Sequence, residues 1–322
     1  MAFDVVTVGG ATVDVFIETA EKELKKDISH RDVCYMVGEK ILVPSMKVDT
    51  GGGGTNTAVA FSKLGLKTGF IGKIGKDMIG KNILSVLGKE KVKFLGSTGN
   101  GESGYSVILM HLPKDRTILT FKGINDQLST RDVKWSGLKA KWIYFSSLMG
   151  QSFATSKKIV SYAKKHKIRW AFNPSMYMAE KGLTYLKPMI NGCDVLIMNK
   201  EEAQALLKSS IDIPALLKKL AKYAKIPIIT DGPKGAYAYF DGVMYHNIPY
   251  NVKVVETTGA GDAFASGVVA GLMLKKDLEF ALRLGQAESE SKIQHLGAKN
   301  GLLSRNEAFR LMNKVKVIKK RI

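Results

Sequence analysis

Cysteine and histidine are scarce in this sequence, and their scarcity excludes several kinds of site. The only two cysteines, Cys34 and Cys193, stand far apart. Neither a disulfide framework nor a Cys-x-x-Cys zinc site is therefore expected. The five histidines are scattered along the chain. Residues 1–6 lack the basic and long apolar regions of a signal peptide, so we expect a protein of a reducing compartment, the cytoplasm.

Long hydrophobic runs and acidic residues are also in short supply. The most apolar stretch, residues 263–274, is too short to span a bilayer, so we expect a buried helix and no membrane partner. Lys and Arg (49) outnumber Asp and Glu (29), which gives a net charge of +20. The lysines are spread over most segments, and only residues 314–321 form a dense run of basic residues. We expect a solvated basic surface rather than specific nucleic-acid binding.

The order of apolar segments and turn residues predicts an α/β fold. In the second half, strands at about 142–146, 168–172, 194–198 and 227–230 alternate with helical patterns such as 151–166. This alternation predicts a parallel sheet with helices on both faces. Polar residues follow several of these strands, at the edge where ligands bind in open α/β sheets. They are Asn173, Asn199 and Thr230.

The first half indicates a small accessory sheet and a ligand site. Strands are expected at about 14–17, 41–48, 105–110 and 117–121, without helices between each pair, and 18–31 is expected to be helix or loop. Four consecutive glycines (51–54) precede Asn56 and a helix at 57–64, which favours close approach of a ligand over a merely flexible turn. Asp14, in an apolar segment, is either a surface residue of an alternating strand or a ligand for substrate hydroxyl groups.

The segment 256–267 has the strongest local pattern. A short β-type run (252–255) leads through Gly259 and Gly261 into the apolar residues 263–274. Strand, glycine turn and buried helix together direct backbone N–H groups and the positive end of a helix dipole at an anion. Asp262, at the start of the helix, is either its N-cap or a base beside an oxyanion hole.

One near-match to a nucleotide-binding motif is rejected. Residues 75–82 almost fit the P-loop pattern, but Asn82 replaces the hydroxyl residue that binds magnesium. Asp77 is instead expected to be the N-cap of a helix over 78–87.

Taken together, these motifs resemble those of the ribokinase-like (PfkB) family of sugar and nucleoside kinases, from Gly9 to about Gly301. The resemblance rests on four motifs in the family's order. They are the glycine segment 51–56 with 72–77, the Asn-x-x-Glu motif at Asn199 and Glu202, the Thr-x-Gly-x-x-Gly motif at Thr230, Gly232 and Gly235, and Thr-Thr-Gly-Ala-Gly-Asp at 257–262. It implies a three-layer α/β/α fold with a mostly parallel central sheet and a small β-sheet lid. The chain would be a single domain (1–322), with the lid built from about 12–50 and 103–123.

The resemblance also implies transfer of the γ-phosphoryl group of ATP to a hydroxyl of a small sugar. Residue roles carry over position by position. Asp262 would be the base, and the backbone of Gly259, Ala260 and Gly261 the anion hole. Asp14, Gly52, Gly53 and Asn56 would bind the substrate. Asn199, Thr230, Gly232, Gly235 and Thr258 would bind the nucleotide, Glu202 with Asn199 would hold Mg²⁺ through water, and Glu256 a monovalent cation such as K⁺.

The sequence departs from the family at two positions that bear on substrate and cation. Glu256 stands where the family commonly carries Asp at its cation site, and residues 146–150 lack the carboxylate with which ribokinases bind ribose. The alternatives are therefore a nucleoside, with Tyr35, Met36 or Tyr105 near its base, or a sugar phosphate, with Lys40, Arg116 or Lys122 near its phosphate. Two further alternatives are ADP as the phosphoryl donor and a non-catalytic nucleotide or sugar sensor. A homodimer that forms through the lid is a separate expectation about assembly.

Overall fold

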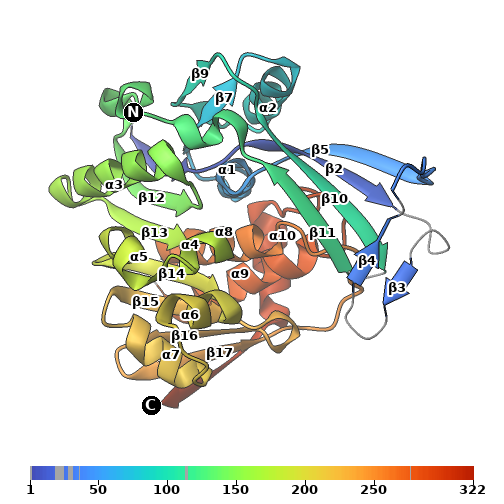
Figure 1. Ribbon diagram of the computed structural model, residues 1–322. Coiled ribbons are helices and arrows are strands. Elements are labelled where there is room, and N and C mark those ends of the chain that lie inside the picture. Colours follow the sequence, from blue (N-terminus) through green and yellow to red (C-terminus); the bar gives the residue numbers. More distant parts are fainter. Residues whose placement is uncertain (1, 19–24, 28–31, 36, 113–114, 276) are drawn as a thin grey trace.

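The computed structural model describes residues 2–18, 25–27, 32–35, 37–112, 115–275 and 277–322. Within them, a ten-stranded sheet lies between two layers of helices, and a four-stranded sheet projects from one side (Figure 1). The large sheet has the order β18 (Lys316–Arg321), β17 (Val243–Ile248), β16 (Ala236–Phe240), β15 (Ala224–Thr230), β14 (Cys193–Asn199), β13 (Arg169–Asn173), β12 (Ala140–Ser146), β1 (Phe3–Val8), β6 (Thr68–Ile71) and β8 (Lys93–Phe94). Strands β15 to β8 pair in parallel and the other three pairs are antiparallel.

Alternation along the central strands builds a core on each face of this sheet. Val6 belongs to the cluster on one face and its neighbour Val5 to the cluster on the other, and both are fully buried. One face is covered by α3 (Gly150–Lys165), α4 (Met176–Ala179), α5 (Gly182–Ile190), α6 (Lys200–Leu207) and α7 (Ile213–Leu220). The other is covered by α1 (Gly53–Lys63), α8 (Ala260–Lys275), α9 (Leu278–Lys292) and α10 (Arg305–Leu311). The expected three-layer α/β/α fold is confirmed.

The smaller sheet confirms the predicted lid sheet. Its order is β11 (Asp115–Phe121), β10 (Gly104–Leu112), β2 (Thr12–Glu18) and β5 (Ser45–Gly51). Strands β10 and β2 are parallel and the outer pairs antiparallel. A third core cluster joins this sheet to α1 and α2 (Met78–Lys89). Two further pairs of strands are β7 (Lys73–Gly75) with β9 (Ser97–Gly99), and β3 (Lys25–Asp27) with β4 (Asp32–Cys34).

Three local predictions are corrected. The strand expected at about 41–48 begins only at Ser45, where pairing with β2 begins. Residues 25–27, expected as helix or loop, form β3, because they pair with β4. Residues 252–255 are not a strand, because the N–H groups of Val255 and Glu256 donate to the carbonyl of Ile293 instead of to a neighbouring strand. Much of 18–31 lies outside the described residues, as does Met36.

Short 3₁₀ turns complete the described elements, and α2 settles the rejected P-loop. The turns are η2 (Gly123–Gln127), η3 (Thr130–Asp132), η4 (Trp135–Gly137), η5 (Gly232–Lys234) and η6 (Met312–Lys314). Asp77 caps α2 by accepting a 2.6 Å hydrogen bond from the N–H of Gly80, as predicted. Gly80 therefore lies inside the helix and not in a phosphate loop.

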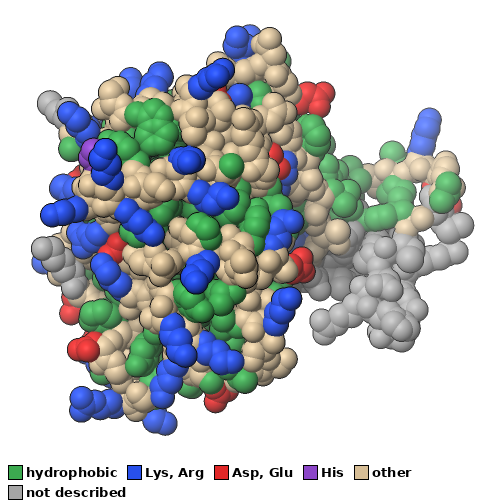
Figure 2. Space-filling view, turned by 60° about the vertical axis from the view of Figure 1, so that its left-hand side comes forward, with side chains coloured by type: hydrophobic (Ala, Val, Ile, Leu, Met, Phe, Trp, Pro, Cys, Tyr) green, Lys and Arg blue, Asp and Glu red, His purple; other side chains and the backbone are tan. Residues whose placement is uncertain are grey.

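Two surface properties were also predicted from composition. Figure 2 shows Lys and Arg side chains scattered over the face in view rather than gathered in one patch. Among the residues that the structure describes, no helix is both long and apolar enough to cross a membrane.

Candidate active site

The carboxyl ends of the parallel strands bring polar side chains to one edge of the sheet. Ser146 lies in register with Asn173, and Asn199 with Thr230. A cavity of about 220 Å³ opens at this edge. The described residues that line it are Gly10, Thr12, Gly52, Gly53, Lys122, Asn125, Asp126, Ser146, Ser147, Leu148, Asn173, Pro174, Ser175, Tyr177, Glu202 and Asp262. The cavity thus brings together predicted base, substrate and magnesium residues from three separate stretches of the chain.

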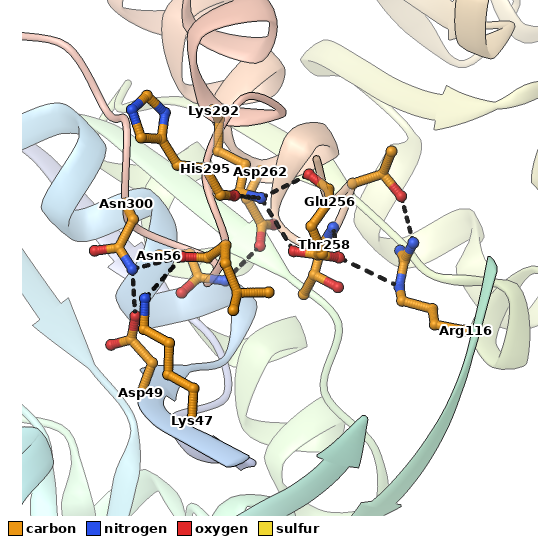
Figure 3. A network of polar contacts seen from close by, with 12 residues as sticks. Lys47, Asp49, Asn56, Arg116, Glu256, Thr258, Asp262, Lys292, His295 and Asn300 are labelled. Carbon is orange, nitrogen blue, oxygen red and sulfur yellow. Dashed lines mark hydrogen bonds and ion pairs between the residues drawn. The ribbon is translucent and has the colours of Figure 1, made fainter. Parts of the chain in front are cut away.

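Asp262 lies on the cavity wall, in the first turn of α8. It is the third residue of that helix, which begins at Ala260, so the N-cap alternative does not describe its position. Its Oδ2 accepts a 2.8 Å hydrogen bond from Nδ2 of Asn56, on α1 (Figure 3). Burial raises the pKa of the Asp262 carboxyl, and the hydrogen bond from Asn56 and the charge of Lys299 oppose that rise.

The turn that precedes Asp262 requires glycine at its first position. Gly259 has a φ of +80°, and a Cβ there would lie 2.5 Å from the carbonyl oxygen of Ala298. Gly261 faces open space. Of the three predicted anion-hole amides, that of Ala260 donates to the carbonyl of Thr257 at 3.1 Å. The amides of Gly261 and Asp262 belong to the first turn, where N–H groups have no partner within a helix.

The glycine segment packs tightly against the first strand. Gly52 has a φ of +92°, and a Cβ on it would lie 2.5 Å from the carbonyl oxygen of Gly10. Gly52 and Gly53 line the cavity. Oδ1 of Asn56 is buried without a hydrogen-bond partner, as are the hydroxyl groups of Ser146 and Ser175 on the cavity wall. Such orphaned polar atoms are costly unless a ligand or water binds them.

Asp14 is buried beside the cavity rather than among the described residues that line it. It lies on β2, between Asp49 on β5 and Ser106 on β10. The hydroxyl of Thr12 donates to its Oδ1 at 2.9 Å, and its carboxylate packs against the Cα of Gly51. Burial raises the pKa of the carboxyl. Asp14 is therefore not the surface residue of an alternating strand, which was one of its two interpretations.

The predicted magnesium residues cap helix α6. The side chain of Asn199 accepts from the N–H of Glu202 at 2.7 Å, and Oε2 of Glu202 accepts from the N–H of Asn199 at 2.8 Å. Glu202 is half-buried on the cavity wall, and burial raises its pKa to about 7. No three His, Cys, Asp or Glu side chains of the described residues gather to hold a metal directly. One carboxylate beside an amide oxygen does fit Mg²⁺ held through water, because that ion keeps several of its waters.

The other predicted nucleotide residues lie beyond this wall. Gly232 and Gly235, in the turn after β15, have φ values of +50° and +87°. A Cβ on Gly235 would lie 2.1 Å from the carbonyl oxygen of Asn247, whereas Gly232 faces open space. The hydroxyl of Thr258 is buried without a partner. Thr230, Gly232, Gly235 and Thr258 are not among the described residues that line the cavity.

Three site residues escaped the sequence analysis. Asp126 lines the cavity, and its Oδ1 accepts from the N–H of Met149 at 3.2 Å. It brings a carboxylate to the segment 146–150 that lacks one of its own. Tyr177 lines the cavity with Lys122, whose ammonium lies 4.6 Å from the centre of the Tyr177 ring.

Lys299 is buried, and its charge opposes the rise that burial causes in the pKa values of Asp14 and Asp262. Burial lowers the pKa of Lys299 itself to about 8. The only sequence feature that marks Asp126 as a site residue is its place in a turn-rich stretch after a lid strand. Lys299 is an isolated lysine, and no sequence feature marks it as a site residue.

Glu256, the predicted cation ligand, is already paired with cations of the protein. Its Oε2 lies 3.2 Å from Nζ of Lys292, and its Oε1 lies 3.7 Å from Nε of Arg116. Oε1 also accepts a hydrogen bond from the N–H of Thr258. With the Lys292 ammonium in this position, the residues present do not fit a bound K⁺.

The comparisons with known proteins identify the family of this chain. Residues 5–305 match the family model for pfkB family carbohydrate kinases. The chain is 28% identical to the ribokinase of Bacillus subtilis over 315 residues, which cover 96% of this chain and 99% of that protein. It is 25% identical to the 5-dehydro-2-deoxygluconokinase of the same species, over 89% of each chain. The solved structure of adenosine kinase from Sinorhizobium meliloti superposes with a TM-score of 0.83 at 21% identity, covering 96% of this chain and 99% of that one. The chain belongs to the pfkB family of carbohydrate kinases.

Proposed function

We propose that the protein transfers the γ-phosphoryl group of ATP to a hydroxyl group of a small sugar, with Asp262 as the base. The observation that carries this proposal is the position of Asp262, on a cavity wall at the first turn of α8. A carboxylate there can take the hydroxyl proton while the neighbouring amides face the moving phosphoryl group. Phosphoryl transfer needs chiefly such positioning and charge stabilisation.

The anion hole consists of first-turn amides. The resemblance implies the backbone of Gly259, Ala260 and Gly261, and because the Ala260 amide is engaged in a turn, the role shifts towards Gly261 and Asp262. The helix dipole adds a partial positive charge at the same point. The interactions of the amides and of the helix dipole with the phosphoryl oxygens become stronger as negative charge develops on those oxygens.

The nucleotide lies along the strand edge from Asn199 to Thr230, and its phosphates approach the turn at Gly232 and Gly235. Glu202, with Asn199, holds Mg²⁺ through water. When bound, that ion neutralises charge on the phosphate oxygens. The orphaned hydroxyl of Thr258 is available to the nucleotide. ATP rather than ADP donates the phosphoryl group.

The acceptor occupies the cavity between Gly53 and Asp126. Gly52 and Gly53 let the acceptor approach the backbone closely. Asn56 and Asp14 lie behind the residues that line the cavity and contribute to acceptor binding from there. Asp126 accepts from a sugar hydroxyl in place of the carboxylate that residues 146–150 lack. Lys122, on the same wall, favours a second candidate, an acceptor that carries a phosphate or another anionic group. Tyr105 is half-buried in the lid core, and Tyr35 is exposed and is not among the described residues that line the cavity, so a nucleoside gains least support. Lys40, a candidate for the phosphate of a sugar phosphate, is exposed too and is likewise absent from that lining.

The test is a nucleotide-consumption screen with ATP or ADP and Mg²⁺ against pentoses, hexoses, sugar acids, sugar phosphates and nucleosides. We expect ATP to be consumed with a sugar or an anionic sugar. Asp262→Asn should lower kcat by about 10³-fold while nucleotide affinity changes little. Activity close to that of the wild type in this variant would refute the role of Asp262. Nucleotide binding without turnover on any acceptor would favour the sensor.

The proposal extends to a cytoplasmic homodimer that pairs through the four-stranded sheet, without nucleic acid or membrane. Exposed apolar side chains on its outer strands support the pairing: Met46, Val48, Leu119 and Phe121. Exposed sheet edges favour association between chains. Sedimentation of the wild type and of Phe121→Lys should give a dimer and a monomer, and a monomeric wild type would contradict this part.

A further inference from the structure

The ammonium of Lys292 is enclosed by oxygen atoms of two separate segments. Its Nζ lies 3.0 Å from the backbone oxygen of Glu256, 3.2 Å from Oε2 of the same residue and 3.2 Å from the backbone oxygen of His295 (Figure 3). The side chain is fully buried. An ammonium has three N–H donors, and these three oxygens account for all of them.

These contacts hold the segment that leads into the candidate active site. Glu256 binds Lys292 through its backbone and one carboxylate oxygen, while the other oxygen accepts the N–H of Thr258. The N–H groups of Val255 and Glu256 donate to the carbonyl of Ile293, next to Lys292. The ammonium therefore fixes where residues 256–258 lie, directly before the turn at Gly259 and the first turn of α8.

A bound alkali cation would need the same atoms. K⁺ in proteins is held by rings of oxygens, above all backbone carbonyls, that replace its hydration shell. The carboxylate of Glu256 and the carbonyls of Glu256 and His295 are such a set, and the ammonium already lies among them. Arg116 adds a second cation at 3.7 Å from the carboxylate. A further cation would meet two like charges in a buried place.

We propose that the Lys292 ammonium substitutes for a bound monovalent cation, so that the protein keeps its anion-hole segment in place and works without K⁺. The inference rests on the proposed phosphoryl transfer for its kinetic part only. Lys292 and the two residues that its ammonium contacts are not among the described residues that line the cavity. Lys292 is therefore a positioning residue that acts through residues 256–258.

The experiment compares wild type, Lys292→Ala and a control in buffers whose only monovalent cation is tetramethylammonium, with K⁺ or NH₄⁺ added at constant ionic strength. Lys275→Ala serves as control, because Lys275 is an exposed lysine near the end of the neighbouring helix α8. Melting temperature of the ligand-free protein is measured first, and kcat and KM second. The alanine variant leaves a space lined by the three oxygens.

We expect the melting temperature and kcat of the wild type and of Lys275→Ala to be the same with and without K⁺. Lys292→Ala should melt about 5 °C lower or more, and its kcat should fall about 100-fold with little change in KM. Added K⁺ or NH₄⁺ should restore much of both losses, whereas tetramethylammonium is too large to do so. A side chain that served packing alone would give no such rescue.

Two outcomes would overturn the proposal. One is a wild type that K⁺ activates or stabilises strongly, and the other is a folded Lys292→Ala that no small cation restores. If the variant fails to fold, crystals of the wild type soaked in Rb⁺ decide the question, since an anomalous peak beside Glu256 contradicts the substitution. If no acceptor is phosphorylated in any salt while the melting temperatures follow the expectation, the proposed function fails and the role of Lys292 stands.

Discussion

Asn56 and Asp262, 206 positions apart in the chain, are joined by a 2.8 Å hydrogen bond from Nδ2 to Oδ2. Asn56 stands on α1, as the last residue of the glycine segment 51–56, and Asp262 stands on the first turn of α8. The bond favours the ionised carboxylate, which is the form a base needs, and it fixes the orientation of that carboxylate.

Asn56→Ala should therefore change the pH dependence of catalysis. Without the hydrogen bond the pKa of Asp262 rises, so the acidic limb of the kcat/KM profile should move to higher pH, and kcat should fall about tenfold or more. The measurement is a full pH profile beside that of Asn100→Ala, a substitution at an exposed position. An acidic limb that stays in place would show that Asn56 does not govern the ionisation of Asp262.

Glu202→Gln should separate magnesium binding from folding. Gln can keep the capping contact with the N–H of Asn199, so the free energy of unfolding should hardly change. The Mg²⁺ concentration for half-maximal activity should rise about tenfold or more. In the wild type that concentration should fall from pH 6 to pH 8, because Glu202, with a pKa of about 7, loses its proton across this range.

The variant should lose this pH dependence. Glu180→Gln, at an exposed position whose charge does not act on Glu202, is the control and should behave as the wild type. Equal magnesium requirements in the wild type and Glu202→Gln would remove Glu202 from the metal site.

Gly259→Ala and Gly261→Ala should fail in different ways. At Gly259 the positive φ and the nearby carbonyl of Ala298 oppose any side chain, so we expect a loss of about 2–4 kcal/mol in unfolding free energy. At Gly261 the added methyl group meets open space, so stability should change by less than about 0.5 kcal/mol. It would still crowd the anion hole and lower kcat about tenfold or more.

Denaturant unfolding and steady-state kinetics on the two proteins provide the comparison. Normal turnover in a fully folded Gly261→Ala would argue against an anion hole at this turn.

Glu288→Gln should raise stability above neutral pH. Burial raises the pKa of Glu288 to about 8, and one of its oxygens is buried without a hydrogen bond. Between about pH 4.5 and pH 8 the folded protein holds a proton that the unfolded chain has released, so stability is full below this window and is lost as pH rises through it. The loss amounts to roughly 5 kcal/mol at most.

A neutral glutamine avoids this loss. Unfolding in denaturant at pH 5 and pH 8.5 should show the advantage of the variant chiefly at the higher pH, with Glu180→Gln, an exposed position, as control. An advantage of equal size at both pH values would mean that the ionisation of Glu288 is not its cause.

Local patterns predicted much of the fold. The apolar runs of β1 and β12 to β15, the N-cap at Asp77 and the glycine turn before α8 each depend on a few consecutive residues, and all were found. Position at a strand end sufficed to expect Asn173, Asn199 and Thr230 at one edge. These features follow from backbone geometry and side-chain periodicity, which act over short stretches.

Features set by distant partners could not be predicted. Residues 252–255 read as a strand, but Ile293 takes the hydrogen bonds of Val255 and Glu256. Lys292 looks like any lysine at the end of a helix, and only the folded chain brings it to Glu256. Asp126 is held at the cavity by the hydrogen bond that its carboxylate accepts from the N–H of Met149. No local sequence pattern predicts this contact.

The position of β1 between β12 and β6 has a consequence for biosynthesis. Its first residue, Phe3, pairs with Ala140, 137 positions later, while the pairing with β6 becomes available much sooner. At about 5–20 residues per second, a ribosome needs roughly 7–30 s to make the missing partner. For that time one edge of β1, with the buried residues Val5, Val6 and Val8, stays open on the nascent chain. Chaperones that bind extended apolar segments would find a target in β1 during this interval.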